Sequence, residues 1–322
     1  MFPAKDQLTI CFAHVAYAMQ DQFAKRKTGI KSFQVRAYDE FEKRVGEADV
    51  VVVSGMWKND IIPKATNLKF IQSISAGMDQ YSKEQLGAKG VRLCSASGVN
   101  ARAVAEHAVA LMLAISRRLP EARDNQHKKF WRGMIGDLTR REDEIGGKTV
   151  LIVGTGKIGS HLAGLCKGFG MKVLGIRRDP SKGADGADSI HGMADLVKLV
   201  PQADYVVLAC ALTPETTGLM SAAAFAAMKP TATFVNVARG KVADEAALIA
   251  TLKAGKIAAA SIDVTAEEPL PEASPLWSLP NVFITPHTAG ETRAYEDNVL
   301  DILQENLDRL WRGEKTLRNQ VL

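Results

Sequence analysis

The apolar residues of the first hundred positions gather in short runs separated by segments with helical spacing. Runs of this length are typical of buried parallel strands joined by crossover helices. The five runs are LTICFAH (8–14), FQVRAYD (33–39), ADVVVVSG (48–55), LKFIQSIS (68–75) and VRLCSASG (91–98). They predict one α/β unit with a doubly wound parallel sheet.

A second α/β series follows a helical segment and a polar stretch. Residues 101–119 are too apolar for a helix with a solvated face, and the polar stretch covers 121–144. The next runs are TVLIVG (149–154), KVLGI (172–176), YVVLAC (205–210), TFVNVA (233–238), AAASIDV (258–264) and VFITP (282–286). We expect a second doubly wound domain over 101–290, inserted into a first domain made of 1–100 and 291–322.

A glycine-rich turn, GTGKIG, joins the first strand of the second series to a helix. Gly154 would permit the tight turn, Gly156 would let the backbone approach a pyrophosphate, and Gly159 would let the helix pack on the strand. Lys157 and Ile158 belong to the same predicted nucleotide-binding turn. The alternative is a plain structural turn.

The residue that follows the next strand bears on the choice of coenzyme. Arg177 stands 18 residues after the last glycine, where an NAD-specific site usually has an acid. An arginine there would pair with a 2′-phosphate, and a charge-assisted hydrogen bond contributes roughly 1.5 to 3 kcal/mol. Arg177 and Arg178 therefore predict NADP(H), with NAD(H) as the alternative if both are solvated and Asp179 takes the role of the acid.

Polar residues end four of the later runs. They lie in CALTPET (210–216), VNVARG (235–240), SIDVTAEEP (261–269) and ITPHTAG (284–290). In open α/β sheets, ligands gather at the carboxyl ends of the strands. Three side chains in these segments are of the types that reduction of a 2-keto acid requires, namely Arg239, Glu268 and His287.

Each of these side chains has a predicted role. Arg239 would bind the carboxylate with two hydrogen bonds and polarise the carbonyl oxygen. His287 would exchange a proton with that oxygen, because an imidazole with a pKa near ~6.5 transfers protons in both directions. Glu268 would hydrogen-bond the ring of His287, and Asp263 would hold the nicotinamide carboxamide. The other histidines have no such partners and are expected to be structural: His14, His107, His127, His161 and His191.

Composition narrows the classes of function. Apolar residues make up 46% of the chain and charged residues 24%, as in ordinary globular proteins. The net charge of +5 comes from scattered residues, so no nucleic-acid partner is expected. No apolar run reaches the ~20 residues that span a bilayer, so no membrane association is expected.

The cysteines bear on metal binding and on the compartment of the protein. Cys11, Cys94, Cys166 and Cys210 lie far apart, without the spacing of zinc ligands, so no metal is expected. Reduced thiols in apolar stretches, together with the absence of a signal peptide, predict a cytoplasmic protein.

Six segments carry a resemblance to a known family. They are NARAVAEHAVALML (100–113), GGKTVLIVGTGKIG (146–159), LTPETTGLM (212–220), KPTATFVNVARGKVADEAAL (229–248), IDVTAEEPLP (262–271) and NVFITPHTAG (281–290). In these segments the chain resembles the D-isomer-specific 2-hydroxyacid dehydrogenases, which include glyoxylate/hydroxypyruvate reductases. The family's active-site arginine, glutamate and histidine match Arg239, Glu268 and His287. The resemblance implies a Rossmann NAD(P)-binding domain inserted in a flavodoxin-like substrate domain.

The resemblance also implies further contacts. Ser75, Ala76 and Gly77 would offer backbone amides to the substrate carboxylate. Homodimers joined through the cofactor domain are usual in the family, and the segment 121–144 with Trp131 would contribute to that contact or else pack within its own subunit. The coenzyme contacts expected besides the glycine turn are Cys210, Thr216, Val237, Ala238 and Gly290.

The substrate itself is predicted from the loop after the third strand. Met56 and Trp57, with Ile74 and Tyr81, would select the side chain of the substrate and favour a small or apolar one. The alternative is that Met56 and Trp57 are packing residues. The predicted reaction is NADPH-driven reduction of a small 2-keto acid such as glyoxylate or hydroxypyruvate to its D-2-hydroxy acid.

Two other functions remain open at this point. Phosphite dehydrogenases use the same three catalytic residues on a similarly anionic substrate. Corepressors of this fold sense NAD(H) and keep the same residues without acting as enzymes. Formate dehydrogenases carry glutamine in place of the glutamate, so Glu268 argues against them.

Overall fold

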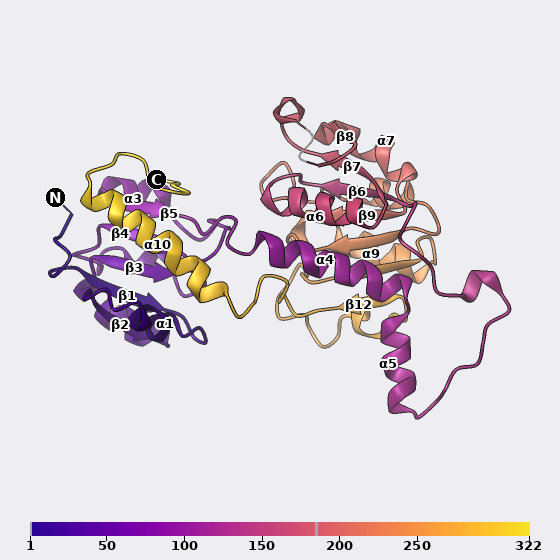
Figure 1. Ribbon diagram of the computed structural model, residues 1–322, viewed down its shortest axis with the longest axis horizontal. Coiled ribbons are helices and arrows are strands. Elements are labelled where there is room, and N and C mark those ends of the chain that lie inside the picture. The colour runs from indigo at the N-terminus through magenta and orange to yellow at the C-terminus, as the bar shows by residue number, and fades with distance from the viewer. Residues whose placement is uncertain (1, 184–185) are drawn as a thin grey trace. The chain divides into compact units, whose positions relative to one another are not determined.

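The computed structural model describes residues 2–183 and 186–322. The chain divides into two compact units, one made of Met1–Asn100 with Thr292–Leu322 and the other of Ala101–Glu291. Each unit contains its own parallel sheet (Figure 1). Two parallel α/β sheets confirm the predicted fold class.

The first unit contains a five-stranded sheet in the order β2-β1-β3-β4-β5. Its strands are β1 (Thr9–Ala13), β2 (Lys31–Val35), β3 (Val50–Val53), β4 (Phe70–Ser73) and β5 (Arg92–Cys94). Its helices are α1 (Met19–Lys25), α2 (Tyr38–Arg44), α3 (Lys83–Ala88) and α10 (Tyr295–Trp311). This strand order is that of flavodoxin-like sheets.

Alternation along the strands builds a core on each face of this sheet. Ile10 and Phe12 of β1 belong to one core cluster, and Cys11 and Ala13 to the other. Successive side chains of a strand point to opposite faces, so a strand covered on both sides is apolar throughout. Helix α10 adds a buried stripe to the first cluster, which explains why the C-terminal segment belongs to this unit (Figure 1).

The second unit contains a seven-stranded sheet in the order β12-β11-β10-β9-β6-β7-β8. Its strands are β6 (Thr149–Val153), β7 (Lys172–Ile176), β8 (Ser189–His191), β9 (Tyr205–Leu208), β10 (Thr233–Asn236), β11 (Ala259–Ile262) and β12 (Val282–Ile284). The six strands from β6 to β11 follow the dinucleotide-binding order, and β12 extends the sheet by one strand. The sequence did not predict β8, because three residues with a serine and a histidine give no apolar run.

The helices of the second unit cover both faces of its sheet. They are α4 (Ala101–Ser116), α5 (Leu119–His127), α6 (Lys157–Gly168), α7 (Leu196–Leu199), α8 (Ala222–Ala226) and α9 (Glu245–Lys253). Helix α4 packs against α6 through a cluster that includes Ala105, Met112 and Leu162. Within residues 2–183 and 186–322, no helix has both the length and the apolar character that crossing a membrane requires.

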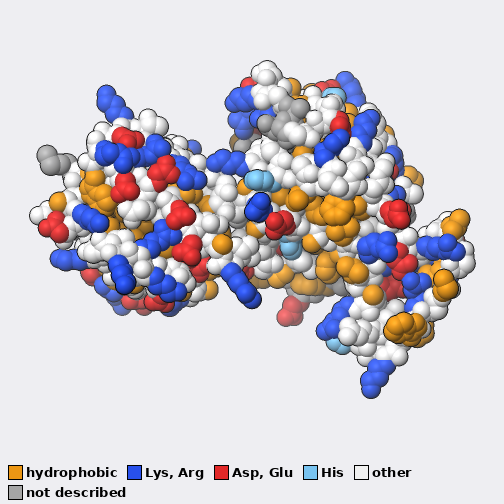
Figure 2. Space-filling model, in the orientation of Figure 1, with side chains coloured by type: hydrophobic (Ala, Val, Ile, Leu, Met, Phe, Trp, Pro, Cys, Tyr) orange, Lys and Arg blue, Asp and Glu red, His pale blue; other side chains and the backbone are white. Residues whose placement is uncertain are grey.

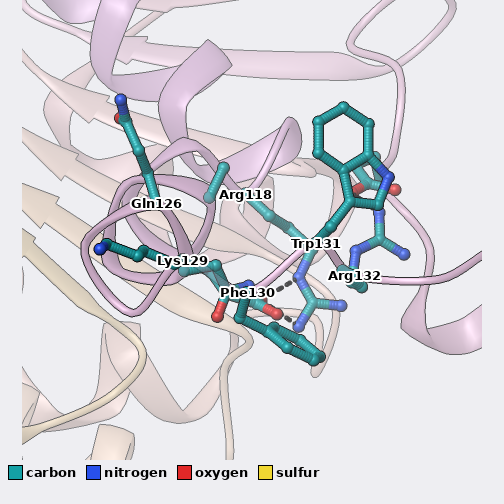
Figure 3. A pocket seen from close by; sticks show the side chains of 10 residues that line it. Arg118, Gln126, Lys129, Phe130, Trp131 and Arg132 are labelled. Atoms are coloured by element: carbon teal, nitrogen blue, oxygen red, sulfur yellow. Dashed lines mark hydrogen bonds and ion pairs between the residues drawn. The ribbon is translucent and has the colours of Figure 1, made fainter.

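The segment after α5 carries several exposed apolar side chains. Trp131 and Met134 are almost fully exposed, and Phe130 and Leu138 are more than half exposed. Figure 2 shows hydrophobic side chains gathered on this part of the surface. Ion pairs brace the segment, since Arg132 lies 2.5 Å from Glu142. Figure 3 shows the hollow that Phe130, Trp131 and Arg132 line together with residues of α5.

Candidate active site

The glycine turn has the geometry that its sequence predicts. Gly154 has φ +105°, and a Cβ there would lie 2.5 Å from the backbone nitrogen of Cys210. A Cβ on Gly159 would lie 2.1 Å from the carbonyl oxygen of Gly154. At Gly156, which caps α6, a Cβ would meet nothing within 4 Å. The protein's own packing therefore demands two of the glycines, while the third leaves open space at a helix N-terminus, where a pyrophosphate fits.

The residues that follow β7 are held by local contacts. Arg177 is partly buried and donates through Nη1 to the carbonyl of Gly183 at 3.1 Å. Arg178 is exposed. Asp179 accepts from the hydroxyl of Ser181 at 2.6 Å and from its amide at 3.2 Å, and these bonds hold the pKa of Asp179 below its usual range. Because its Oδ1 is engaged in this turn, Asp179 is poorly placed to replace the ribose-binding acid.

Glu268 and His287 form a close pair. Glu268 Oε2 lies 2.6 Å from His287 Nδ1, and Glu268 Oε1 accepts from the amide of Thr265 at 3.1 Å. Both side chains are partly exposed, at 37% for Glu268 and 46% for His287. The carboxylate thus orients the ring through one nitrogen, which leaves Nε2 to exchange a proton with a ligand.

A buried asparagine shapes the turn that carries Arg239. Asn236, the last residue of β10, is 2% exposed. Its Oδ1 accepts from the amide of Ala238 at 3.0 Å, and its Nδ2 donates to the carbonyl of Arg239 at 3.1 Å. Arg239 in turn donates to the carbonyl of Ala238 at 2.7 Å. Asn236 was not among the predicted residues, although an amide at the end of an apolar strand was a usable signal.

Gly240 brings the Arg239 turn against the loop that leads to Glu268. A Cβ on Gly240 would lie 1.9 Å from the carbonyl carbon of Thr265, so only glycine fits. The same loop is tied to α9, because the amide of Ala266 donates to Glu245 at 2.8 Å. Arg239 and Glu268 therefore lie on two loops in direct backbone contact.

Asp263 holds the turn of His287. His287 has φ +56°, a left-handed conformation that costs a residue of this type roughly 1 to 3 kcal/mol. The amide of His287 donates to the carbonyl of Asp263 at 2.8 Å. The Asp263 carboxylate accepts from the Thr285 hydroxyl at 2.6 Å and from the amides of Thr288 and Ala289, each at 3.0 Å. Asp263 was predicted as a coenzyme contact, and the contacts that the structure shows are those of a residue that shapes the turn of His287.

His107, one of the histidines expected to be structural, lies close to an acidic residue. His107 Nε2 lies 2.9 Å from the hydroxyl of Thr285 and 3.5 Å from Asp263 Oδ1. The expectation that His107 lacks such partners is therefore wrong. The sequence could not show them, because His107 and Thr285 are 178 residues apart.

The remaining predicted coenzyme contacts surround the same edge of the sheet. Cys210 lies against Gly154, and burial raises the pKa of its thiol to about 11. Val237 and Ala238 are each 6% exposed. Lys157 and Ile158 open α6, and Gly290 follows the His287 turn.

Thr216, a predicted coenzyme contact, forms hydrogen bonds within its own turn. Its hydroxyl accepts from the amide of Thr213 at 2.7 Å and donates to the carbonyl of Ala211 at 2.7 Å. Its residue is 8% exposed. The hydroxyl closes its own turn, which argues against a direct contact with the coenzyme.

In the first unit, hydroxyl groups meet at the carboxyl ends of β3 and β4. Ser54 Oγ lies 2.7 Å from Ser75 Oγ, and Gln80 donates to Ser54 Oγ at 3.2 Å. The amide of Ser75 donates to Ser73 Oγ at 3.2 Å. A contact of the Ser75, Ala76 and Gly77 amides with a substrate carboxylate stays a prediction. Ser54 and Gln80 were not among the predicted site residues.

The aromatic residues predicted to select the substrate are packing residues. Trp57 is 2% exposed, with its ring 5.7 Å from that of Tyr81. Tyr81 is also buried and donates to the carbonyl of Val53 at 2.8 Å, and Ile74 lies in the opposite core cluster. The packing alternative therefore holds for Trp57, and Ile74 and Tyr81 are likewise core residues. Met56, which is partly exposed, stays a predicted substrate contact.

The chain matches known proteins over nearly its whole length. A family model described as "D-isomer specific 2-hydroxyacid dehydrogenase, NAD binding domain" matches residues 109–289. Glyoxylate reductase/hydroxypyruvate reductase of Mus musculus is 36% identical over 249 residues, which are 77% of this chain and 75% of the relative. A solved structure of a D-isomer specific 2-hydroxyacid dehydrogenase family protein from Aeromonas salmonicida is 31% identical, with a TM-score of 0.85 over 98% of this chain and 99% of the other.

Longer relatives match as well. D-3-phosphoglycerate dehydrogenase of Archaeoglobus fulgidus is 35% identical over 287 residues, which are 88% of this chain and 53% of the relative. The chain thus spans about half the length of the D-3-phosphoglycerate dehydrogenases that it matches. The family model covers more than half of the chain, and relatives of similar length share more than 30% identity with it. The chain therefore belongs to the D-isomer specific 2-hydroxyacid dehydrogenase family, and its residues 109–289 match the NAD-binding domain of that family.

Proposed function

We propose that this protein is an NAD(P)-dependent oxidoreductase that interconverts a small 2-keto acid and its D-2-hydroxy acid. The observation that carries the proposal is the contact of 2.6 Å between Glu268 and His287, in the same unit as the glycine turn. Arg239 binds the carboxylate and polarises the carbonyl oxygen. His287 donates the proton from Nε2 to that oxygen, while Glu268 holds Nδ1. A nicotinamide coenzyme held at the glycine turn would supply the hydride to the carbonyl carbon.

We propose NADP(H) as the preferred coenzyme, with NAD(H) as the weaker alternative. Arg177 and Arg178 directly follow β7, where an acid would select NAD, and Asp179 is engaged by Ser181. In Arg177→Asp we expect the preference for NADPH to fall by roughly ten- to a hundredfold, because a charge-assisted bond to the phosphate is replaced by repulsion. The ratio of kcat/KM for NADPH and NADH measures this. A wild-type protein with a tenfold preference for NADH would contradict the proposal.

We propose glyoxylate- or hydroxypyruvate-like substrates, in the direction of reduction. The polar groups of Ser54, Ser75 and Gln80 suit a substituent that forms hydrogen bonds, and relatives named glyoxylate/hydroxypyruvate reductase match most of the chain. A phosphorylated substrate is the second candidate, because relatives named D-3-phosphoglycerate dehydrogenase match equally well.

A substrate screen tests the reaction. Oxidation of NADPH and of NADH is followed with glyoxylate, hydroxypyruvate, pyruvate, phenylpyruvate and 3-phosphohydroxypyruvate, and NAD(P)⁺ reduction is followed with phosphite. We expect the highest kcat/KM with NADPH and glyoxylate or hydroxypyruvate. Turnover of phosphite alone would establish the phosphite dehydrogenase alternative. Coenzyme binding without turnover of any 2-keto acid would favour a nucleotide-sensing corepressor.

We propose that the protein forms a homodimer through its cofactor domain. The exposed side chains of Phe130, Trp131, Met134 and Leu138 lie on one segment of that unit, and large apolar side chains of this kind mark interaction surfaces. Light scattering on wild type and on Trp131→Ser/Met134→Ser tests this. A dimer that persists unchanged in the variant would place the contact elsewhere.

We also propose a reducing compartment, the cytoplasm, as the location. Cys11, Cys94 and Cys166 are buried free thiols, and burial raises the pKa of each to about 12. Such thiols are inert packing groups. Cell fractionation tests this location.

A further inference from the structure

A chain of polar side chains links helix α4 to the turn that carries His287. His107 lies on α4, Thr285 directly follows β12, and Asp263 directly follows β11. His107 Nε2 is 2.9 Å from Thr285 Oγ1, which is 2.6 Å from Asp263 Oδ1. The Asp263 side chain is 1% exposed and that of His107 is 23% exposed. All three residues belong to the second unit.

The direction of these hydrogen bonds follows from the number of hydrogens. Thr285 has one hydroxyl hydrogen, and the carboxylate of Asp263 accepts it. The Thr285 oxygen can then only accept from His107, so Nε2 of His107 must carry a hydrogen. A carboxylate that accepts from a hydroxyl, which accepts from an imidazole, forms a cooperative chain.

Asp263, at one end of this row of hydrogen bonds, contacts the turn that carries His287 through backbone amides. The amide of His287 donates to the Asp263 carbonyl, and the amides of Thr288 and Ala289 donate to its carboxylate. His287 has φ +56°, and a strained conformation of this kind persists only where its surroundings fix it. The orientation of Asp263 therefore determines whether the turn keeps its shape.

The position of His107 within its helix sets it apart from a packing residue. It shares a face with Val104 and Leu111, which lie three residues before and four residues after it and are buried in the apolar cluster. An apolar side chain at 107 would continue that stripe. The imidazole instead meets a hydroxyl and a carboxylate there.

We propose that His107 is a positioning residue, which holds the His287 turn through Thr285 and Asp263. The hydrogen bond from His107 keeps the Thr285 hydroxyl directed at Asp263 Oδ1. Without it, the hydroxyl can rotate, the carboxylate gains freedom, and the turn relaxes away from the conformation in which Glu268 meets His287. His107 itself exchanges no proton with the substrate.

Matched variants separate this role from packing. His107→Gln keeps an N–H donor at nearly the same place, and His107→Phe keeps the ring but removes the donor. Thr285→Ser keeps the hydroxyl, and Thr285→Val removes it at equal volume. His161→Phe, on an exposed position of α6, controls for the change of residue type.

We expect kcat to fall roughly two- to tenfold in His107→Phe and in Thr285→Val, the size of one lost hydrogen bond, with a smaller change in coenzyme KM. We expect kcat to stay within about twofold of wild type in the three control variants, His107→Gln, Thr285→Ser and His161→Phe. In the double variant His107→Phe/Thr285→Val, kcat should fall no further than in the worse single variant, because both substitutions break the same row of hydrogen bonds. Equal losses of kcat and of the melting temperature in His107→Gln and His107→Phe would show a packing role and overturn the proposal.

A second measurement does not depend on turnover, because the inference on kcat rests on the proposed function. In protein labelled with ¹³C-histidine, the Cε1–H signal of His287 is assigned from its loss in His287→Asn. We expect that signal to shift in His107→Phe and Thr285→Val and to stay in place in the conservative variants. An unmoved signal in both donor-deleting variants would overturn the proposal. A moved signal in a protein that turns over no 2-keto acid would support the positioning role while rejecting the proposed function.

Discussion

At the carboxyl edge of the second sheet, buried Asn236 and Asp263 fix the turns of Arg239 and His287 through bonds to backbone amides and carbonyls. At the carboxyl edge of the first sheet, Ser54, Ser75 and Gln80 bond to one another through side chains that rotate. Backbone bonds to a buried acceptor leave one conformation, whereas hydroxyl groups can exchange partners. The groups proposed for proton transfer are therefore held by hydrogen bonds that leave one conformation. The groups proposed to contact the substrate side chain are held by hydrogen bonds that can rearrange.

The largest expected effect falls on the rigid edge. In His287→Asn we expect kcat/KM to fall by roughly 10² to 10⁴, the usual contribution of general acid–base catalysis. Asparagine tolerates a left-handed conformation, so the turn with φ +56° should keep its shape. Steady-state NADPH oxidation measures the loss, and an unchanged melting temperature is the control. Retention of a tenth or more of the activity would remove His287 from the reaction.

Trp57 and Met56 are neighbours in the first unit, but Trp57 is a core residue and Met56 is partly exposed. Trp57→Ala should lower the free energy of unfolding by roughly 3 to 5 kcal/mol, because the indole is buried between Phe41 and Tyr81. Met56→Ala is expected to cost less stability and to change the preference among 2-keto acids. Denaturant unfolding and the ratio of kcat/KM values for glyoxylate and hydroxypyruvate measure the two effects. A Trp57 variant of normal stability with altered preference would restore it as a substrate contact.

The loops that carry Arg239 and Glu268 touch at Gly240. In Gly240→Ala the new methyl group would overlap the backbone of Thr265, and overpacking of this kind costs roughly 1 to 3 kcal/mol. We expect a lower free energy of unfolding together with a lower kcat, because the Arg239 turn must move away from the Glu268 loop. Gly164→Ala is the matched control, since its Cβ would meet nothing within 4 Å inside α6. If both variants behave alike, the loops do not depend on this close approach.

The smallest effect is expected at the adaptable edge. Ser54→Ala removes one hydroxyl from a cluster that can rearrange, so we expect a change of roughly 0.5 to 1.5 kcal/mol in transition-state binding, mostly through KM. The ratio of kcat/KM for hydroxypyruvate and pyruvate reports it, because only hydroxypyruvate offers a hydroxyl on its third carbon. An equal loss for both substrates would mean that Ser54 supports the loop and does not read the substituent.

The sequence by itself determined the two parallel sheets, the glycine turn and the three candidate catalytic residues. Each of these depends on local features: an apolar run long enough for a buried strand, glycines between a strand and a helix, and polar residues just after a strand. Arg239, Glu268 and His287 follow different strands, but parallel strands end at one edge, so the sequence could predict their neighbourhood. Strand β8 was not predicted, because its three residues do not form an apolar run.

Only the tertiary structure decided which residues support the site and which fill the core. Trp57 follows a strand end, as a substrate contact would, and yet its ring is buried with Phe41 and Tyr81. In the sequence, His107 is one polar residue on an apolar helix. In the fold, α4 brings it to Thr285, which lies 178 residues further along the chain. Periodicity reports only whether a position is buried. Which side chains meet at a buried position depends on how helices and loops from distant parts of the chain pack, and that packing fixes the hydrogen bonds around the His287 turn.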